Sequence, residues 1–160
     1  MSDQLLLADP AATEAFGRLL ARSLPADVAG WTILLQGELG SGKSTLARAM
    51  LRECGHSGAV PSPTYTLIEP YKLSDKYIYH IDLYRIADEE ELDYLGWADL
   101  EDGLRLIEWP ERVPGLTSQA DMLVRLAYDG AGRMATLTAL SERGAEYLAR
   151  LALPQPSDQR

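Results

Sequence analysis

Cysteine is nearly absent from this sequence of 160 residues, which contains Cys54 and no other. A single cysteine excludes an internal disulfide and a metal site made of several thiolates, and we expect Cys54 to be an inert thiol near a helix end. Long apolar runs are absent as well, since no stretch approaches the roughly 20 residues that a membrane-spanning helix requires. The first residues, Met1 to Gln4, lack the basic start of a secretion signal. The sequence therefore predicts a cytoplasmic protein.

Basic residues are few. The chain has 15 lysines and arginines, scattered along its length, against 24 acidic residues, and its formal charge is −9. Long-range electrostatic repulsion would oppose charge-driven binding to the phosphate backbone of a nucleic acid. A protein or a nucleotide is easier to reconcile with this charge as the direct partner.

Composition and length indicate one folded unit. Apolar residues make up 46% and charged residues 24% of the chain, which are ordinary values for a globular protein. A chain of this length buries most of its apolar surface in one core without help from disulfides. We find no internal repeat and no linker. We therefore predict a single domain over residues 1–153, with both ends of the chain frayed and a disordered tail over residues 154–160.

Apolar spacing and capping residues predict alternating helices and strands. Asp9 and Pro10, followed by apolar residues at helical spacing, predict a helix that ends before Pro25. The apolar run 31–36 predicts a buried strand, and residues 45–54 have helical spacing. We expect that helix to stop at Gly55. Two β-hairpins are expected, one of residues 65–71 and 76–81 and one of residues 122–128 and 133–140. The other expected elements are a helix opened by the acidic residues 88–91 with Leu92, Leu95 and Leu100 on its apolar side, a strand over 104–107, and a last helix capped by Ser141 that runs through Leu151.

A glycine-rich segment carries the strongest functional signal. Gly37, four further residues and then Gly42, Lys43 and Ser44 lie between the expected strand and helix, which is the P-loop signature in its required context. Together with Gly40, these glycines allow the loop to point its amides at phosphate oxygens, next to the positive end of the following helix. We expect Lys43 at the β and γ phosphates and the Ser44 hydroxyl on magnesium. The pattern predicts a site for a nucleoside triphosphate with Mg²⁺.

Such a site also needs a carboxylate for the metal, at a place where an apolar strand meets a loop. Glu108 and Asp82 both stand at such a place. The alternative for each is an ordinary exposed acid at the end of a strand. Thr64 lies in a proline-stiffened loop about twenty residues past the P-loop. It could belong to a switch segment that senses the γ phosphate, or its hydroxyl could form a hydrogen bond with its own backbone in a turn. His80 alternates with apolar neighbours, which favours a core position or a supporting role behind the site. Trp109, Pro110 and Tyr84 form either a docking surface or buried aromatic packing.

Four segments together resemble one known family. Residues 37–48, 62–67, 80–85 and 106–110 are similar, in the same order, to the bacterial TsaE (YjeE) family, and the match extends from about Leu5 to Tyr128. The resemblance implies an α/β protein with a P-loop NTPase-like three-layer fold, in which helices flank a mixed, mostly parallel sheet. It also implies a weak ATPase that acts in the synthesis of threonylcarbamoyladenosine (t6A) beside the anticodon of tRNAs. In that family the protein binds the TsaD–TsaB complex, and its ATPase cycle is needed for repeated turnover.

The resemblance also implies roles for single residues. Ser44 and Glu108 would hold magnesium, Lys43 the phosphates, and Thr64 and Asp82 would take switch or catalytic roles. The family commonly has threonine in place of Ser44, and a small residue such as alanine in place of Ser41, and both changes keep the needed chemistry. The expected ATP-binding residues are Thr13 (near the adenine), Glu38, Leu39, Gly40, Ser41, Gly42, Lys43, Ser44 and Thr45, and the expected catalytic residues are Asp82, Glu108, Thr64 and Lys43. The TsaD–TsaB complex is the expected partner, with tRNA reached only indirectly.

Two other functions fit the P-loop. One is a small-molecule kinase, against which we find no arginine-rich lid segment. The other is a nucleotide-gated binding module with negligible catalysis, in which Glu108 and Asp82 hold metal without driving chemistry. A guanine-specific GTPase is disfavoured because no Asn-Lys-x-Asp segment occurs. Which of Asp82 and Glu108 positions the attacking water stays open at this point.

Overall fold

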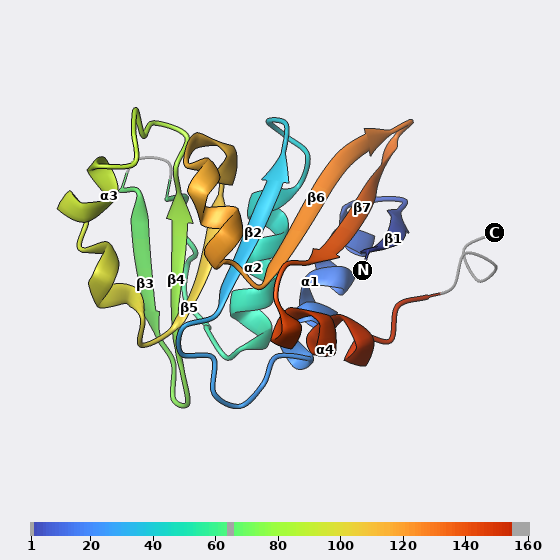
Figure 1. Ribbon diagram of the computed structural model, residues 1–160. Coiled ribbons are helices and arrows are strands. Elements are labelled where there is room, and N and C mark those ends of the chain that lie inside the picture. The colour runs from blue at the N-terminus through green and yellow to red at the C-terminus, as the bar shows by residue number, and fades with distance from the viewer. Residues whose placement is uncertain (1, 64–65, 155–160) are drawn as a thin grey trace.

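The computed structural model describes residues 2–63 and 66–154. Its strands are β1 (Ser2–Leu7), β2 (Thr32–Gly37), β3 (Ile68–Lys72), β4 (Tyr77–Asp82), β5 (Leu104–Glu108), β6 (Met122–Asp129) and β7 (Gly132–Ala139). They form one sheet in the order β1-β7-β6-β2-β5-β4-β3 (Figure 1). Strands β6, β2, β5 and β4 pair in parallel, and β7 and β3 run against them. Because β1 is antiparallel to β7, five of the seven strands share one direction, which confirms the expected mixed, mostly parallel sheet.

Helices cover both faces of the sheet. They are α1 (Pro10–Arg22), α2 (Lys43–Glu53), α3 (Glu91–Tyr94) and α4 (Glu142–Arg150), with the 3-10 helices η1 (Trp97–Leu100), η2 (Pro110–Arg112) and η3 (Pro114–Gln119). Side chains of α1, α2 and α4 pack in one core cluster, and those of α3, η1 and η3 pack in a second. The ribbon shows α2 and the short helices on opposite sides of the sheet (Figure 1). Along β2, Ile33 and Leu35 point to the first cluster and Leu34 to the second, as the alternation of a strand requires. The result is the expected three-layer arrangement.

Capping residues fix the ends of two helices where the sequence predicts them. The Asp9 carboxylate accepts a hydrogen bond from the Ala12 amide at 2.8 Å, and α1 ends at Arg22. The Ser141 hydroxyl accepts from the Gly144 amide at 3.0 Å at the start of α4. Both hairpins are also confirmed, because β3 pairs with β4 and β6 with β7. The first hairpin begins at Ile68, and residues 64 and 65 lie outside the described part of the chain.

The expectation of a frayed N-terminus is wrong. Residues 2–7 form the edge strand β1, which pairs with β7 over its whole length. Leu5 and Leu7 are 5% and 2% exposed, and both pack in the core cluster on the side of α1. The partner strand lies about 130 residues away, so nothing local in the sequence indicates the pairing. Of the predicted tail over residues 154–160, residues 155–160 lie outside the described residues, and both the tail and the single-domain boundary at residue 153 stay predictions.

The single helix expected after the acidic residues 88–91 is also wrong. Helix α3 has only four residues, because Gly96 takes a left-handed conformation with φ of +74° and the chain resumes as η1. Leu92 and Leu100 are still buried, at 4% and 8% exposure, so the expected apolar side exists without a continuous helix. Within residues 2–63 and 66–154, no helix has the length and apolar character needed to cross a bilayer.

Candidate nucleotide-binding site

The glycine-rich loop lies between the end of β2 and the start of α2, at the centre of the sheet (Figure 1). Gly37 is the last residue of β2 and Lys43 the first residue of α2. Gly40 and Gly42 have φ of +78° and +109°, a conformation that glycine adopts without the strain of a side chain. Ser41 and Lys43 are buried, at 1% and 4% exposure. The chain therefore wraps tightly at the amino end of α2, where unpaired amides favour an anion.

Substitution of Gly37 tests how tightly this loop is packed. A Cβ atom at Gly37 would lie 2.4 Å from the Ser41 Oγ and 2.6 Å from the backbone oxygen of Leu126. We expect Gly37→Ala to lower the free energy of unfolding by about 1–3 kcal/mol, because the backbone must shift. The same shift should weaken nucleotide binding, measured by calorimetry beside thermal unfolding.

The matched control is Gly58→Ala, since a Cβ atom there meets only the His56 ring, at an ordinary 3.5 Å. It should leave both measurements close to those of the native protein. A Gly37→Ala variant with native stability and native nucleotide affinity would contradict the packing of the loop described above.

Lys43 folds back over the loop. Its Nζ donates hydrogen bonds to the carbonyl oxygens of Gly37 and, at 3.2 Å, of Glu38. The same nitrogen lies 4.1 Å from the centroid of the Trp109 ring, a cation–π contact. Carbonyls and an aromatic face thus hold the ammonium group inside the loop.

The electrostatic surroundings of Lys43 act in opposite directions. Burial lowers the pKa of its ammonium group below the ordinary value, because the charged form loses solvation. The negative charges of Glu108, Glu111 and Asp82 favour the charged amine and oppose this shift in pKa. The ammonium is therefore a desolvated cation among carboxylates, an arrangement in which charge acts strongly on a bound anion.

The two predicted acids lie together opposite the first turn of α2. Asp82 and Glu108 end β4 and β5 and are register partners in the parallel pair. Ser44 Oγ lies 3.2 Å from Glu108 Oε1 and 3.4 Å from Oε2, and donates to this carboxylate. Asp82 Oδ1 accepts from the Tyr84 amide at 2.8 Å. One cavity of about 200 Å³ is lined by Leu39, Gly40, Gly42, Lys43, Ser44, Thr45, Asp82, Glu108 and Trp109.

The donors in this cavity suit magnesium. Mg²⁺ prefers oxygen ligands and is usually bound by one or two carboxylates together with phosphate oxygens and water. Ser44 and Glu108 offer a hydroxyl and a carboxylate whose oxygens already lie side by side. In the described part of the chain, no group of three or more histidine, cysteine, aspartate or glutamate side chains is arranged to hold a metal by itself. A hydroxyl and a carboxylate supply two oxygen ligands, and phosphate and water oxygens are the others that Mg²⁺ usually takes beside a nucleotide.

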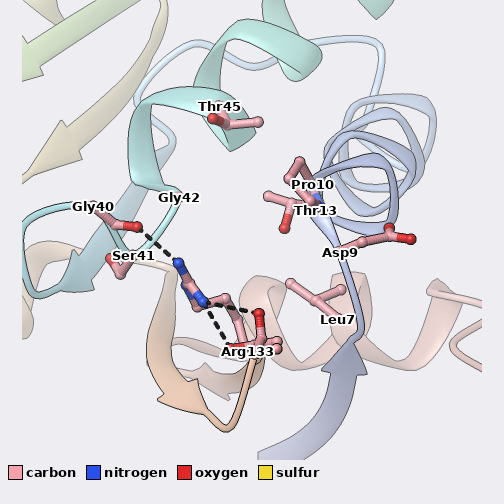
Figure 2. Close-up of a pocket in the computed structure, with 11 residues that line it drawn as sticks. Leu7, Asp9, Pro10, Thr13, Gly40, Ser41, Gly42, Thr45 and Arg133 are labelled. Atoms are coloured by element: carbon pink, nitrogen blue, oxygen red, sulfur yellow. Dashed lines mark hydrogen bonds between the residues drawn. The ribbon is translucent and has the colours of Figure 1, made fainter.

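A second cavity, of about 160 Å³, lies on the other side of the loop between α1 and the β6–β7 hairpin (Figure 2). Thr13 of α1 is 4% exposed and faces the loop across this cavity, near Gly42. Thr13 is far from the P-loop in the sequence, yet the structure brings it beside the loop. Its predicted contact with the adenine stays a prediction.

Two residues of the β6–β7 hairpin hold the loop and were missed in the sequence. The Tyr128 hydroxyl donates to the Leu39 carbonyl at 2.7 Å, and Arg133 Nη2 donates to the Gly40 carbonyl at 3.2 Å. The Arg133 guanidinium also lies 4.2 Å from the centroid of the Tyr128 ring. Figure 2 shows Arg133 reaching from the hairpin to Gly40. No sequence signal indicated these contacts, because they depend on the sheet that brings β6 and β7 beside the loop.

The remaining candidates fall into different places. Thr64 lies outside the described residues. Leu39 is 84% exposed at the tip of the loop. Tyr84 is 47% exposed and contacts Trp109, with ring centroids 4.9 Å apart and ring planes tilted by 56°, whereas Pro110 is buried. Neither a docking surface nor buried aromatic packing describes all three of these residues, because Tyr84 lies on the surface and Trp109 contacts Lys43.

The strand, glycine loop and helix at the centre of this mixed, mostly parallel sheet define the class: this is a protein with the P-loop fold, which implies nucleotide binding. Comparison of sequences gives the family. Residues 7–135 match the family model described as "Threonylcarbamoyl adenosine biosynthesis protein TsaE". The chain belongs to this TsaE family, and the resemblance carried by the four segments is confirmed.

Individual relatives agree with the family profile. The chain is 47% identical over 114 residues to the tRNA threonylcarbamoyladenosine biosynthesis protein TsaE of Haemophilus influenzae, covering 70% of this chain and 72% of the relative. It is 40% identical over 124 residues to the protein of the same name from Synechocystis, covering 74% and 76%. Its structure is similar to the crystal structure of YdiB from Bacillus subtilis, with a TM-score of 0.73, 23% identity and 95% of each chain covered. This last likeness bears on the fold alone.

Proposed function

We propose that this protein binds ATP with Mg²⁺ and hydrolyses the nucleotide to drive or reset the TsaD–TsaB complex during t6A synthesis on tRNA. The observation that supports this most directly is the cavity in which the Ser44 hydroxyl, the Glu108 and Asp82 carboxylates and the Lys43 ammonium meet at the amino end of α2. Membership in the TsaE family supports the pathway.

Binding is assigned to the loop and the residues beside it. The amides of residues 38–45 and the Lys43 ammonium hold the phosphates, while Thr13 and the cavity next to it receive the adenosine end. Ser44 and Glu108 hold the metal ion. When bound, Mg²⁺ neutralises part of the phosphate charge that develops during transfer to water.

Catalysis is assigned to the second carboxylate. Glu108 already accepts a hydrogen bond from the Ser44 hydroxyl, which is why we assign it to the metal. Asp82 lines the same cavity from the end of the neighbouring strand. We assign to Asp82 the orientation of the attacking water and to Lys43 the stabilisation of charge on the γ phosphate. The switch role of Thr64 rests on the sequence alone.

Dependence on a partner follows from the charge in this cavity. Among its described lining residues, Lys43 is the only cation. P-loop enzymes that lack a second positive charge hydrolyse slowly until a partner completes the site. The charge of −9 supports a partner protein that contacts tRNA in place of this chain, and action on tRNA supports a cytoplasmic location.

The test is ATP hydrolysis by the purified protein with Mg²⁺, alone, with TsaD–TsaB, and with TsaD–TsaB and tRNA. We expect slow turnover alone and at least about tenfold stimulation by TsaD–TsaB, because contact completes the site. Calorimetry should detect ATP binding without the partner. No binding of ATP would reject the nucleotide assignment, and binding without stimulation would reject the role assigned to TsaD–TsaB. Transfer of phosphate to a metabolite would instead identify a kinase.

A further inference from the structure

A buried histidine lies directly behind the carboxylate assigned to the metal. His80, on the neighbouring strand β4, is 1% exposed, and its Nε2 lies 2.6 Å from Glu108 Oε2. Ile78 of β4 and Leu106 of β5 pack in the cluster on the side of α2. His80 and Glu108 each lie two residues further along the same strands, so strand alternation directs both side chains to that face. The contact is therefore built by the sheet.

The hydrogen bond places a proton on the imidazole nitrogen that faces Glu108. A carboxylate only accepts, so Nε2 is the donor to Glu108 Oε2. Nδ1 is buried, and no described residue gives it a hydrogen-bond partner. The ring therefore buries one polar nitrogen that no described residue satisfies.

Packing alone does not account for a histidine here. An apolar side chain of similar size would fill the same space without burying an unpaired nitrogen, which costs free energy. The only described polar contact of the ring is the one to Glu108. The role of His80 therefore lies in the effect of this hydrogen bond on the Glu108 carboxylate.

The bond restrains how the carboxylate turns. With Oε2 held by His80, Oε1 is the nearer of the two carboxylate oxygens to Ser44 Oγ, at 3.2 Å against 3.4 Å. We propose that His80 is a positioning residue that orients Glu108, together with Ser44, for magnesium. This inference rests on the proposed function, since it concerns the same metal. Partners behind a metal ligand commonly change metal affinity by about 10–100-fold when they are removed.

Three substitutions separate positioning from packing. In His80→Gln the side-chain amide reaches about as far as the imidazole Nε2 and donates a hydrogen bond. His80→Asn carries the same amide on a side chain shorter by one methylene, so it is the matched control that cannot reach Glu108. His80→Leu removes the donor and keeps an apolar filling.

The measurement is the affinity for ADP by calorimetry at a series of Mg²⁺ concentrations, with EDTA as the metal-free reference. For His80→Asn and His80→Leu we expect the Mg²⁺ concentration of half-maximal effect to rise at least about tenfold, with the EDTA affinity unchanged. His80→Gln should restore the Mg²⁺ dependence to within about threefold of the native protein. Thermal unfolding is recorded in parallel, because a purely structural role lowers stability without moving the Mg²⁺ dependence.

A second measurement needs no variant. In the ¹⁵N NMR spectrum of the native protein, the His80 ring should show a protonated Nε2, and Mg²⁺ added to the ADP complex should shift the Nε2 signal. A bare Nε2 or an unchanged Mg²⁺ dependence in a folded His80→Asn variant overturns the proposal. If the native protein itself shows no Mg²⁺-dependent nucleotide binding, the proposed function fails instead.

Discussion

A Lys43→Ala variant is expected to bind ATP about 100-fold more weakly than the native protein and to hydrolyse it at a rate near background. Lys43 is the only cation among the described residues that line the cavity, and it is buried against the loop that we propose holds the phosphates. A desolvated positive charge attracts an anion far more strongly than an exposed one does. Calorimetry with ATP and Mg²⁺ measures the affinity, and release of inorganic phosphate measures the turnover.

The matched control for this prediction is Lys72→Ala. Lys72 is an exposed lysine of β3 whose Nζ lies over the Tyr77 ring, 5.7 Å from its centroid. Its removal changes the net charge by the same amount and should leave ATP affinity and turnover at native values. Equal losses in the two variants would mean that the effect comes from overall charge. Native affinity in Lys43→Ala would remove Lys43 from the phosphate site.

The elements around the site could be predicted because their signals are local. The apolar run of β2, the glycine loop and the helical spacing of α2 follow one another in the sequence, and each has its own pattern. The edge strand β1 has no such signal, because its pairing with β7 depends on the whole sheet. The break at Gly96 was missed for a related reason: the acidic start and the leucine spacing favour a helix, and only the packed structure shows where the chain turns.

The candidate site divides in the same way. Asp82 and Glu108 could each be predicted from the sequence, because each ends an apolar strand where a loop begins, and the structure shows that they are register partners. Tyr128 and Arg133 could not, since their bonds to the loop require the hairpin to return beside it. The contact of His80 with Glu108 lies between: the alternation of β4 indicated a buried or supporting position, and the structure supplied the partner.

An Asp82→Asn variant is expected to lose turnover by about 10²–10³-fold while its affinity for ATP stays within about threefold of native. The amide has nearly the shape of the carboxylate, and its oxygen can still accept the hydrogen bond from the Tyr84 amide, 2.8 Å long in the native protein. The negative charge that orients and polarises a water is lost, whereas the loop, Lys43 and Ser44 are untouched. Single-turnover hydrolysis with Mg²⁺, beside calorimetry, separates the two effects.

Glu108→Gln is the informative comparison, because the two acids are register partners at the ends of adjacent strands and differ in what they contact. Glu108 faces Ser44 and His80, so its amide variant should weaken binding only when Mg²⁺ is present. If Asp82→Asn also loses Mg²⁺-dependent affinity, Asp82 belongs to the metal and the assignment of the water to it is wrong. If turnover is negligible in the native protein and Asp82→Asn keeps its ATP affinity but no longer binds TsaD–TsaB, the protein acts as a nucleotide-gated module, because the carboxylate then serves the partner and not the chemistry.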